Sequence, residues 1–343
     1  MIIPNELRSR LVKPAFPRAS TYDAEFLLDT WMGPNVLWLT EWATSALPLQ
    51  PGMRILDLGC GKAASSIFLA KEFGVTVWAA DLWISPADNL RRVEVAGLMD
   101  RVLPVHAEAH ALPFAAGYFD AIISIDAYHY FGTDDLYLGY ILKFLRPSGH
   151  LCVVAPGLHD ELADAPPDWL RPYWESEFCS FHSPSWWRRH WSKTGLVEID
   201  CADTLADGWQ LWAEWNECSA EAGVGPGGGS GAAREAEMLR LDQGRTLTLT
   251  RGRRKAFPRI VVSAHGDEFA SHARGGSGRS RMAAGDCQER PLSALSGRCC
   301  GQSGRRKVAP YPTLTVPSQT AHFNYARAPP RRRARLPRRP MAR

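Results

Sequence analysis

The chain has 343 residues, of which 45% are hydrophobic, and this length allows one large domain or two. Residues 252–343 hold 20 Lys and Arg against 4 Asp and Glu, while all 13 Trp lie between Trp31 and Trp215. The composition therefore predicts an acidic folded body followed by a basic tail, and no run of about 18 apolar residues occurs that could span a membrane.

The start of the chain turns polar at once, without the apolar stretch of a secretion signal, so we expect a cytoplasmic protein. The eight cysteines show neither a Cys-x-x-Cys pair nor metal-ligand spacing with His. This pattern favours free thiols and predicts no metal site. The sequence specifies no oligomeric state.

The first 20 residues are polar, contain three prolines and are expected to form a loose lead. From Tyr22 to Leu47, apolar residues recur at helical spacing on both sides of Gly33-Pro34. We therefore predict two helices that are broken at this Gly-Pro pair.

A strand, a glycine turn and a helix start follow one another from Met53 to Lys71. Residues 54–58 form a short apolar run suited to a strand buried on both faces, and Gly59 and Gly61 come directly after it. Glycines at such a turn let a ligand approach the backbone, close to the free N–H groups of the next helix. Asp57, two residues before the first glycine, suits a ligand that carries an ammonium group better than one that carries a pyrophosphate.

The second predicted strand, residues 75–80, ends at Asp81. An acidic residue at a strand end about 20 residues past the glycine turn can accept hydrogen bonds from both hydroxyls of a ribose. The spacing from Gly61 to Asp81 fits this role, and the alternative is a solvated carboxylate. A helix is predicted from Pro86 to Gly97, entered at Ser85.

Further strands and helices alternate along the rest of the folded body. The expected elements after Asp81 are strands at 102–106, 119–125, 151–155, 196–201 and 246–250, with helices after 133–135 and over 183–195, 208–222 and 232–243. Strands that alternate with helices in this way predict a doubly wound, largely parallel sheet.

The pattern Asp57-x-Gly59-x-Gly61 resembles motif I of the class I S-adenosylmethionine (SAM)-dependent methyltransferases. The Leu-Pro-Phe sequence at 112–114 and the turn at 145–149 also resemble segments of that family, so the resemblance covers about residues 50–155. It implies an α/β protein with a Rossmann-like, seven-stranded sheet. The implied organisation is a helical N-terminal lid over 1–47, a SAM-binding domain over 48–251 with cap insertions at 156–183 and 203–244, and a disordered tail over 252–343.

The resemblance also implies the residues that bind SAM. Glu108 would hold the adenine amino group, at a position where Asp is commoner in the family. The full set of implied cofactor contacts is Asp57, Gly59, Cys60, Gly61, Asp81, Leu82, Glu108, Ala109 and Asp126. Ala63 and Ser148 stand where the family usually has glycine.

The segment after the fourth strand lies nearest to the transferred methyl group in proteins of this family. Asp126, Tyr128, His129 and Tyr130 are therefore the candidates for contacts with the methyl acceptor. His129 is the predicted general base because its ordinary pKa lies near neutrality, and the alternative is a purely structural ring. Asp126 lacks recognisable partners for binding a metal.

The Trp residues at 186, 187 and 191 point in different directions on one helix, so some of them could line a pocket for a small apolar or aromatic acceptor. Motifs of nucleic-acid base methylation are absent, which makes a nucleic-acid substrate unexpected. Two alternatives stay open: a SAM-fold binding protein without catalysis, or an RNA-associated methyltransferase recruited by its basic tail. The tail itself is either a nucleic-acid-binding arm, with 331–335 as its strongest cluster, or a non-native extension.

Overall fold

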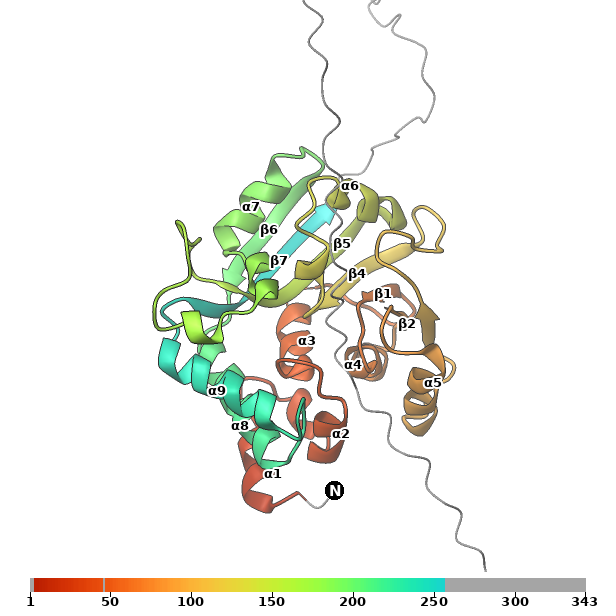
Figure 1. Ribbon diagram of the computed structural model, residues 1–343. Coiled ribbons are helices and arrows are strands. Elements are labelled where there is room, and N and C mark those ends of the chain that lie inside the picture. The colour runs from red at the N-terminus through yellow and green to blue at the C-terminus, as the bar shows by residue number, and fades with distance from the viewer. Residues whose placement is uncertain (1–2, 46, 257–343) are drawn as a thin grey trace, which may run out of the picture. The chain divides into compact units, whose positions relative to one another are not determined.

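The computed structural model describes residues 3–45 and 47–256 (Figure 1). Within these residues, seven strands form one sheet in the order β3-β2-β1-β4-β5-β7-β6. The strands are β1 (Arg54–Leu58), β2 (Thr76–Asp81), β3 (Val102–His106), β4 (Phe119–Ile125), β5 (Leu145–Leu158), β6 (Val197–Thr204) and β7 (Leu247–Ala256). Strands β1 to β5 are parallel, and β7 is inserted antiparallel between β5 and β6. The predicted seven-stranded α/β sheet is confirmed.

Helices cover both faces of the sheet. One face packs against α3 (Val36–Thr44), α4 (Ala64–Phe73) and α5 (Pro86–Val95), and the other against α6 (Tyr137–Ile141) and α7 (Pro184–Ser192). The remaining helices are α1 (Asn5–Leu11), α2 (Ala24–Asp29), α8 (Gly208–Glu221) and α9 (Ser230–Asp242), with 3-10 turns η1 (Ala19–Thr21), η2 (Tyr128–Tyr130), η3 (Leu142–Phe144), η4 (Arg171–Tyr173) and η5 (Ser176–Ser180). None of the helices within 3–45 and 47–256 is long and apolar enough to cross a membrane.

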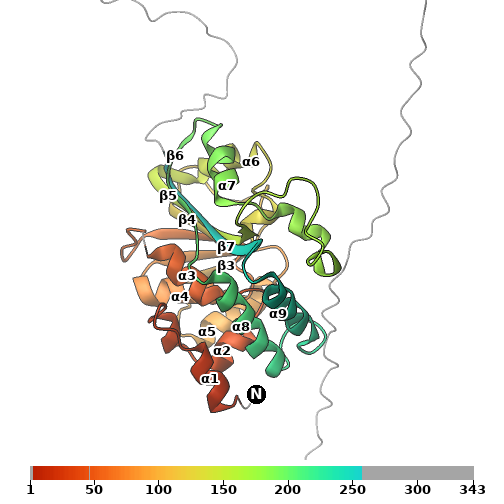
Figure 2. The same ribbon diagram turned by 90° about the vertical axis from the view of Figure 1, so that its left-hand side faces the viewer.

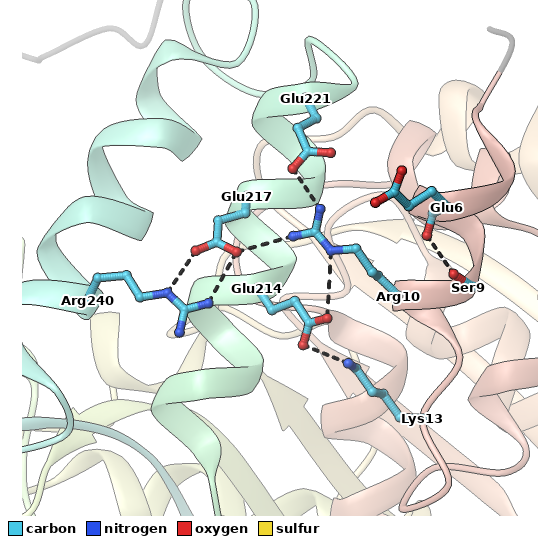
Figure 3. Close-up of polar contacts among 8 residues, drawn as sticks. All are labelled: Glu6, Ser9, Arg10, Lys13, Glu214, Glu217, Glu221 and Arg240. Carbon is cyan, nitrogen blue, oxygen red and sulfur yellow. Dashed lines mark hydrogen bonds and ion pairs between the residues drawn. The ribbon is translucent and has the colours of Figure 1, made fainter.

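The polar start of the chain is a folded element, which corrects the expectation of a loose lead. Helix α1 buries Leu7 and Leu11 in a cluster shared with α2, α3 and α8, and Figure 2 shows these helices on one side of the sheet. Ion pairs join the same elements (Figure 3). Arg10 pairs with Glu217 at 3.2 Å and with Glu221 at 2.6 Å, both on α8. The lid is therefore built from both ends of the folded part of the chain.

Two further ion pairs extend this network. Lys13 pairs with Glu214 of α8 at 2.6 Å, and Arg240 of α9 pairs with Glu217 at 2.7 Å. The Glu217 carboxylate thus accepts hydrogen bonds from Arg10 of α1 and from Arg240 of α9 (Figure 3). The three helices α1, α8 and α9 are cross-linked by charge as well as by apolar packing.

Strand β7 runs to Ala256, past Arg251, where the sequence predicted the domain to close. Backbone pairing continues to the end of the strand, with Lys255 opposite both His150 of β5 and Glu198 of β6. The predicted boundary therefore falls inside a central strand and is too early. The predicted tail from 257 onward lies outside the described residues.

Two residues that stand in place of family glycines adopt a left-handed backbone. Ala63, the N-cap residue of α4, has φ of 61°, and Ser148, in the turn before the core of β5, has φ of 63°. L-residues with a Cβ are disfavoured in this region. The backbone thus keeps the glycine conformation although the glycines themselves are replaced.

Candidate functional site

A cavity of about 300 Å³ lies at the carboxyl ends of β1, β2 and β4. Parallel strands in a doubly wound sheet bring their connecting loops together at this edge, where ligands bind in such folds. The loop between α2 and α3 and Trp215 of α8 close the cavity from the other side. The site is therefore enclosed between the sheet and the helices of the lid.

The glycine turn after β1 forms one wall of the cavity. Gly59 has φ of 74°, and a Cβ at this position would overlap the side chain of Ala127. The Gly61 N–H donates a hydrogen bond to Asp81 Oδ2 at 2.8 Å. The close approach of Ala127 explains physically why the turn needs glycine here.

Asp81 lines the cavity, as predicted from its place at the end of β2. Its Oδ1 accepts from the backbone N–H groups of Trp83 and Ile84, each at 2.8 Å. Burial raises the pKa of its carboxyl. Asp81 thus fixes the turn after β2 and the glycine turn together, and its contact with a ribose stays a prediction.

Asp57 lies outside the cavity lining, which corrects the expectation that it contacts the ligand. It is fully buried, and its Oδ2 accepts from the hydroxyls of Ser65 and Ser66, each at 2.6 Å. Burial raises the pKa of Asp57 to about 6. The carboxyl therefore joins β1 to the first turn of α4 as a structural strut.

The other predicted cofactor contacts lie along the cavity. Glu108, Cys60, Leu82 and Ala109 all contribute to its lining. The Glu108 carboxylate accepts from the His110 backbone N–H at 2.8 Å and contacts His110 Nδ1 at 2.8 Å. Hydrogen bonding to His110 lowers the pKa of Glu108, which keeps it ionised. Its contact with adenine stays a prediction.

Asp126 and Tyr130 lie together at the end of β4 and both face the cavity. Asp126 has φ of 56°, and its carboxylate approaches Gly33 so closely that a Cβ there would overlap Oδ2. No hydrogen-bond donor in the described part of the chain reaches this carboxylate. Burial, and then the charge of Glu235, raise its pKa well above the ordinary value.

Tyr128 and His129 lie outside the cavity lining, and the general-base prediction for His129 is corrected. Tyr130 of the η2 turn lines the cavity, and the His129 ring is packed behind it, with its centroid 4.1 Å from that of Tyr130 and 5.5 Å from that of Phe181. His129 is only 2% exposed, and burial lowers its pKa to about 3. A ring that is enclosed and this weakly basic does not accept a proton from a substrate in the cavity.

The aromatic wall of the cavity comes from Trp31, Trp83 and Trp215, whereas the tryptophans of α7 lie elsewhere. Trp187 and Trp191 are buried in the core on the opposite face of the sheet, which corrects their expected place in a pocket. Trp83 is 70% exposed and its ring meets that of Tyr130 at 5.7 Å between centroids. These two rings flank the mouth of the cavity.

Sequence reasoning missed two polar residues of the lining, Lys62 and Asn35. Lys62 Nζ donates to the Asp29 carbonyl at 2.7 Å. Asn35 is 2% exposed; its Oδ1 caps α3, and its Nδ2 has no hydrogen-bond partner in the described part of the chain. The N-cap pattern before α3 could have indicated Asn35 as a fixed residue, but its free donor depends on the tertiary packing.

The described ranges 3–45 and 47–256 contain no group of three or more His, Cys, Asp or Glu side chains that could hold a metal ion.

Comparison with known proteins matches residues 55–149 to the methyltransferase domain family. Methyltransferase GfsG of Streptomyces halstedii is 33% identical over 37% of this chain and 47% of its own length. The fatty-acid O-methyltransferase of Mycolicibacterium smegmatis is 29% identical over 39% of this chain and 44% of its own length. The chain thus spans less than half of the length of these two relatives.

A solved structure with the same fold is that of a putative sarcosine dimethylglycine methyltransferase from Galdieria sulphuraria. It superposes with a TM-score of 0.53 at 20% identity, over 65% of this chain and 87% of that protein. This likeness shows a shared fold. The matched family model shows that residues 55–149 of this chain carry a methyltransferase domain.

Proposed function

We propose that this protein transfers a methyl group from SAM to a small acceptor. The observation that carries the proposal is the single cavity wall shared by the glycine turn and by Asp126 and Tyr130, which brings a cofactor-binding segment next to a candidate acceptor segment. The matched methyltransferase family supports the same activity.

Several residues of the cavity lining support SAM as the ligand by their chemistry. The glycine turn leaves room for a ligand against the backbone, and Asp81 retains acceptor capacity for hydroxyl groups of a ribose. Lys62 and the free Asn35 Nδ2 are donors suited to a carboxylate. The lining therefore offers complementary groups for the ribose and for the amino-acid end of SAM.

Bound SAM supplies a methyl group made electrophilic by its positively charged sulfur. The chain contributes position, because an in-line displacement is accelerated mainly by holding the two reacting atoms close and aligned. Asp126 is the group at the cavity best suited to take a proton from the acceptor, because its carboxylate is free of hydrogen bonds and burial raises its pKa well above the ordinary value, which makes it a stronger base. Tyr130 and Trp83 limit the acceptor at the mouth.

The aromatic lining supports a small apolar or aromatic acceptor. The charges around Tyr130 favour a second candidate, an acceptor with a basic nitrogen. Burial is the largest cause that raises the pKa of Tyr130, and the charges of four carboxylates add to it: Asp126, Glu177, Glu235 and Glu175. Such surroundings stabilise a cation beside an aromatic ring.

The test begins with isothermal titration of the full chain with SAM, followed by transfer of labelled methyl groups to matched phenols and amines of equal size. SAM binding with transfer to one of these classes supports the proposal, and the preferred class decides between the two candidates. SAM binding without transfer to any small acceptor favours the non-catalytic alternative. Absence of SAM binding refutes the proposed activity itself.

A further inference from the structure

Arg254 is a fully buried cation in an otherwise apolar part of the core. It lies in β7 opposite Leu151 of β5 and Ile199 of β6, with an exposed fraction of 0%. Directly opposed residues of antiparallel strands place their side chains on the same face. Leu151 belongs to the cluster that also contains Tyr128 and Trp191. The guanidinium group is therefore enclosed by large apolar and aromatic side chains.

None of the three guanidinium nitrogens of Arg254 reaches an acceptor in the described part of the chain. Burial lowers the pKa of Arg254 to about 9, so the group still carries its proton at neutral pH. A buried charge without a counter-charge is strongly destabilising, and native proteins pair such groups. The packing of the fold around Arg254 thus requires an acceptor that the surrounding side chains do not provide.

Two further donors lie in the same cluster. The Tyr128 hydroxyl and the Trp191 indole N–H are both buried, and neither makes a hydrogen bond of good geometry among the described residues, although Trp191 lies close enough to Tyr128 to lower the pKa of its hydroxyl. Their rings meet edge to face at 6.0 Å between centroids, and Tyr128 is close enough to Arg254 for its charge to affect the pKa of the arginine. A cation, a hydroxyl and an indole N–H therefore share one region that contains no carboxylate partner.

We propose that Arg254, Tyr128 and Trp191 hold a small inorganic anion, of the size and charge of chloride, between β7 and η2. A monovalent anion balances the single guanidinium charge, and the complete burial of Arg254 favours a small ion. Tyr128 is the first residue of η2, and Tyr130 at the end of that turn lines the cavity. The anion would therefore fix the wall of the cavity from behind, and this site does not depend on the proposed methyl transfer.

The first test compares the melting temperature of the full chain in sodium chloride and in sodium gluconate at equal ionic strength. An anion bound only by the folded state raises the melting temperature as its concentration rises, with a logarithmic dependence once the concentration exceeds the dissociation constant. Line broadening of the chloride-35 NMR signal, reversed by bromide, should report the same site directly. Equal melting temperatures in both salts and an unbroadened signal would overturn the proposal.

The second test uses the direction in which a substitution shifts the melting temperature. Removing an unpaired buried charge stabilises a protein, whereas removing one half of a buried pair destabilises it. In chloride, Arg254→Met should therefore lower the melting temperature and abolish its chloride dependence. The control Arg253→Met changes the neighbouring residue, which pairs with Asp200 at 3.6 Å, and should keep the chloride dependence. A higher melting temperature of Arg254→Met in chloride would refute the site.

If Arg254→Met fails to fold, the variant Tyr128→Phe tests the anion site instead. This variant removes one donor and keeps the ring that packs against Trp187 and Trp191. We expect its apparent chloride affinity to fall at least threefold. An unchanged affinity would contradict the assignment of the anion to this cluster.

Discussion

Asp57→Asn separates the structural role of this residue from the ligand contact expected from its place in the motif. Burial raises the pKa of Asp57 from 3.8 to about 6, so the folded state binds more protons than the unfolded state between these values. Stability is therefore lost as the pH rises through this window, by roughly 3 kcal/mol in total and about 1 kcal/mol between pH 5 and pH 8. Asparagine does not titrate, and its Oδ1 can still accept from the Ser65 and Ser66 hydroxyls.

We therefore expect the free energy of unfolding of Asp57→Asn, relative to the wild type, to increase by about 1 kcal/mol from pH 5 to pH 8. Urea unfolding at the two pH values measures it, and Asp100→Asn, whose side chain is 74% exposed, controls for the change in net charge. The SAM dissociation constant should stay within about twofold, because Asp57 lies outside the cavity. A stability difference that does not vary with pH would refute the structural role of the Asp57 carboxyl between β1 and α4. A large loss of SAM affinity would support the original prediction that Asp57 contacts the ligand.

Four further changes test the site, the backbone, the lid and the domain boundary. Asp81→Ala should weaken SAM binding by about 1.5 to 3 kcal/mol, as measured by titration calorimetry, since charge-assisted hydrogen bonds are lost; an unchanged constant contradicts the ribose contact. Ser148→Gly should raise the free energy of unfolding by about 0.5 to 1 kcal/mol because φ is positive there, and a loss in urea unfolding would contradict this. Arg10→Met should cost up to about 1 kcal/mol at low salt and less at high salt, whereas a salt-independent cost would show that packing dominates. Truncation after Ala256 should preserve the melting temperature, whereas truncation after Arg251 should lower it sharply because half of β7 is removed; equal effects would refute the boundary.

The central strands β1 and β4 were predictable because they are buried on both faces and therefore read as apolar runs. Residues 119–125, for example, are buried at every position, and Ser85 and Ser183 cap the helices that they were expected to begin. The order of strand, glycine turn and helix start likewise predicted that a ligand site lies beside Gly59 and Gly61, and both glycines line the cavity. Local sequence was sufficient where burial and capping alone determine the element.

The errors concern side-chain direction and distant partners. Asp57 and His129 were assigned by their position in the chain, but the Asp57 carboxylate is held by the serines of α4 and the His129 ring is enclosed by Tyr130 and Phe181. Trp187 and Trp191 face the sheet because Tyr128 and Leu151 provide the core there. Helix α1 is too short and polar to show a period, and its partners are encoded about 200 residues later. These features depend on tertiary packing.

The ion pairs between α1 and α8 also set an order of events during synthesis. Arg10 is made early, yet its partner Glu221 is separated from it by 211 positions in the chain. At about 5 to 20 residues per second, a ribosome needs on the order of 10 to 40 seconds to bridge that interval. The strands that carry the glycine turn, Asp81 and Asp126 emerge before α8 does. The nascent protein therefore passes through a stage in which the floor of the cavity has been made while its lid is still incomplete.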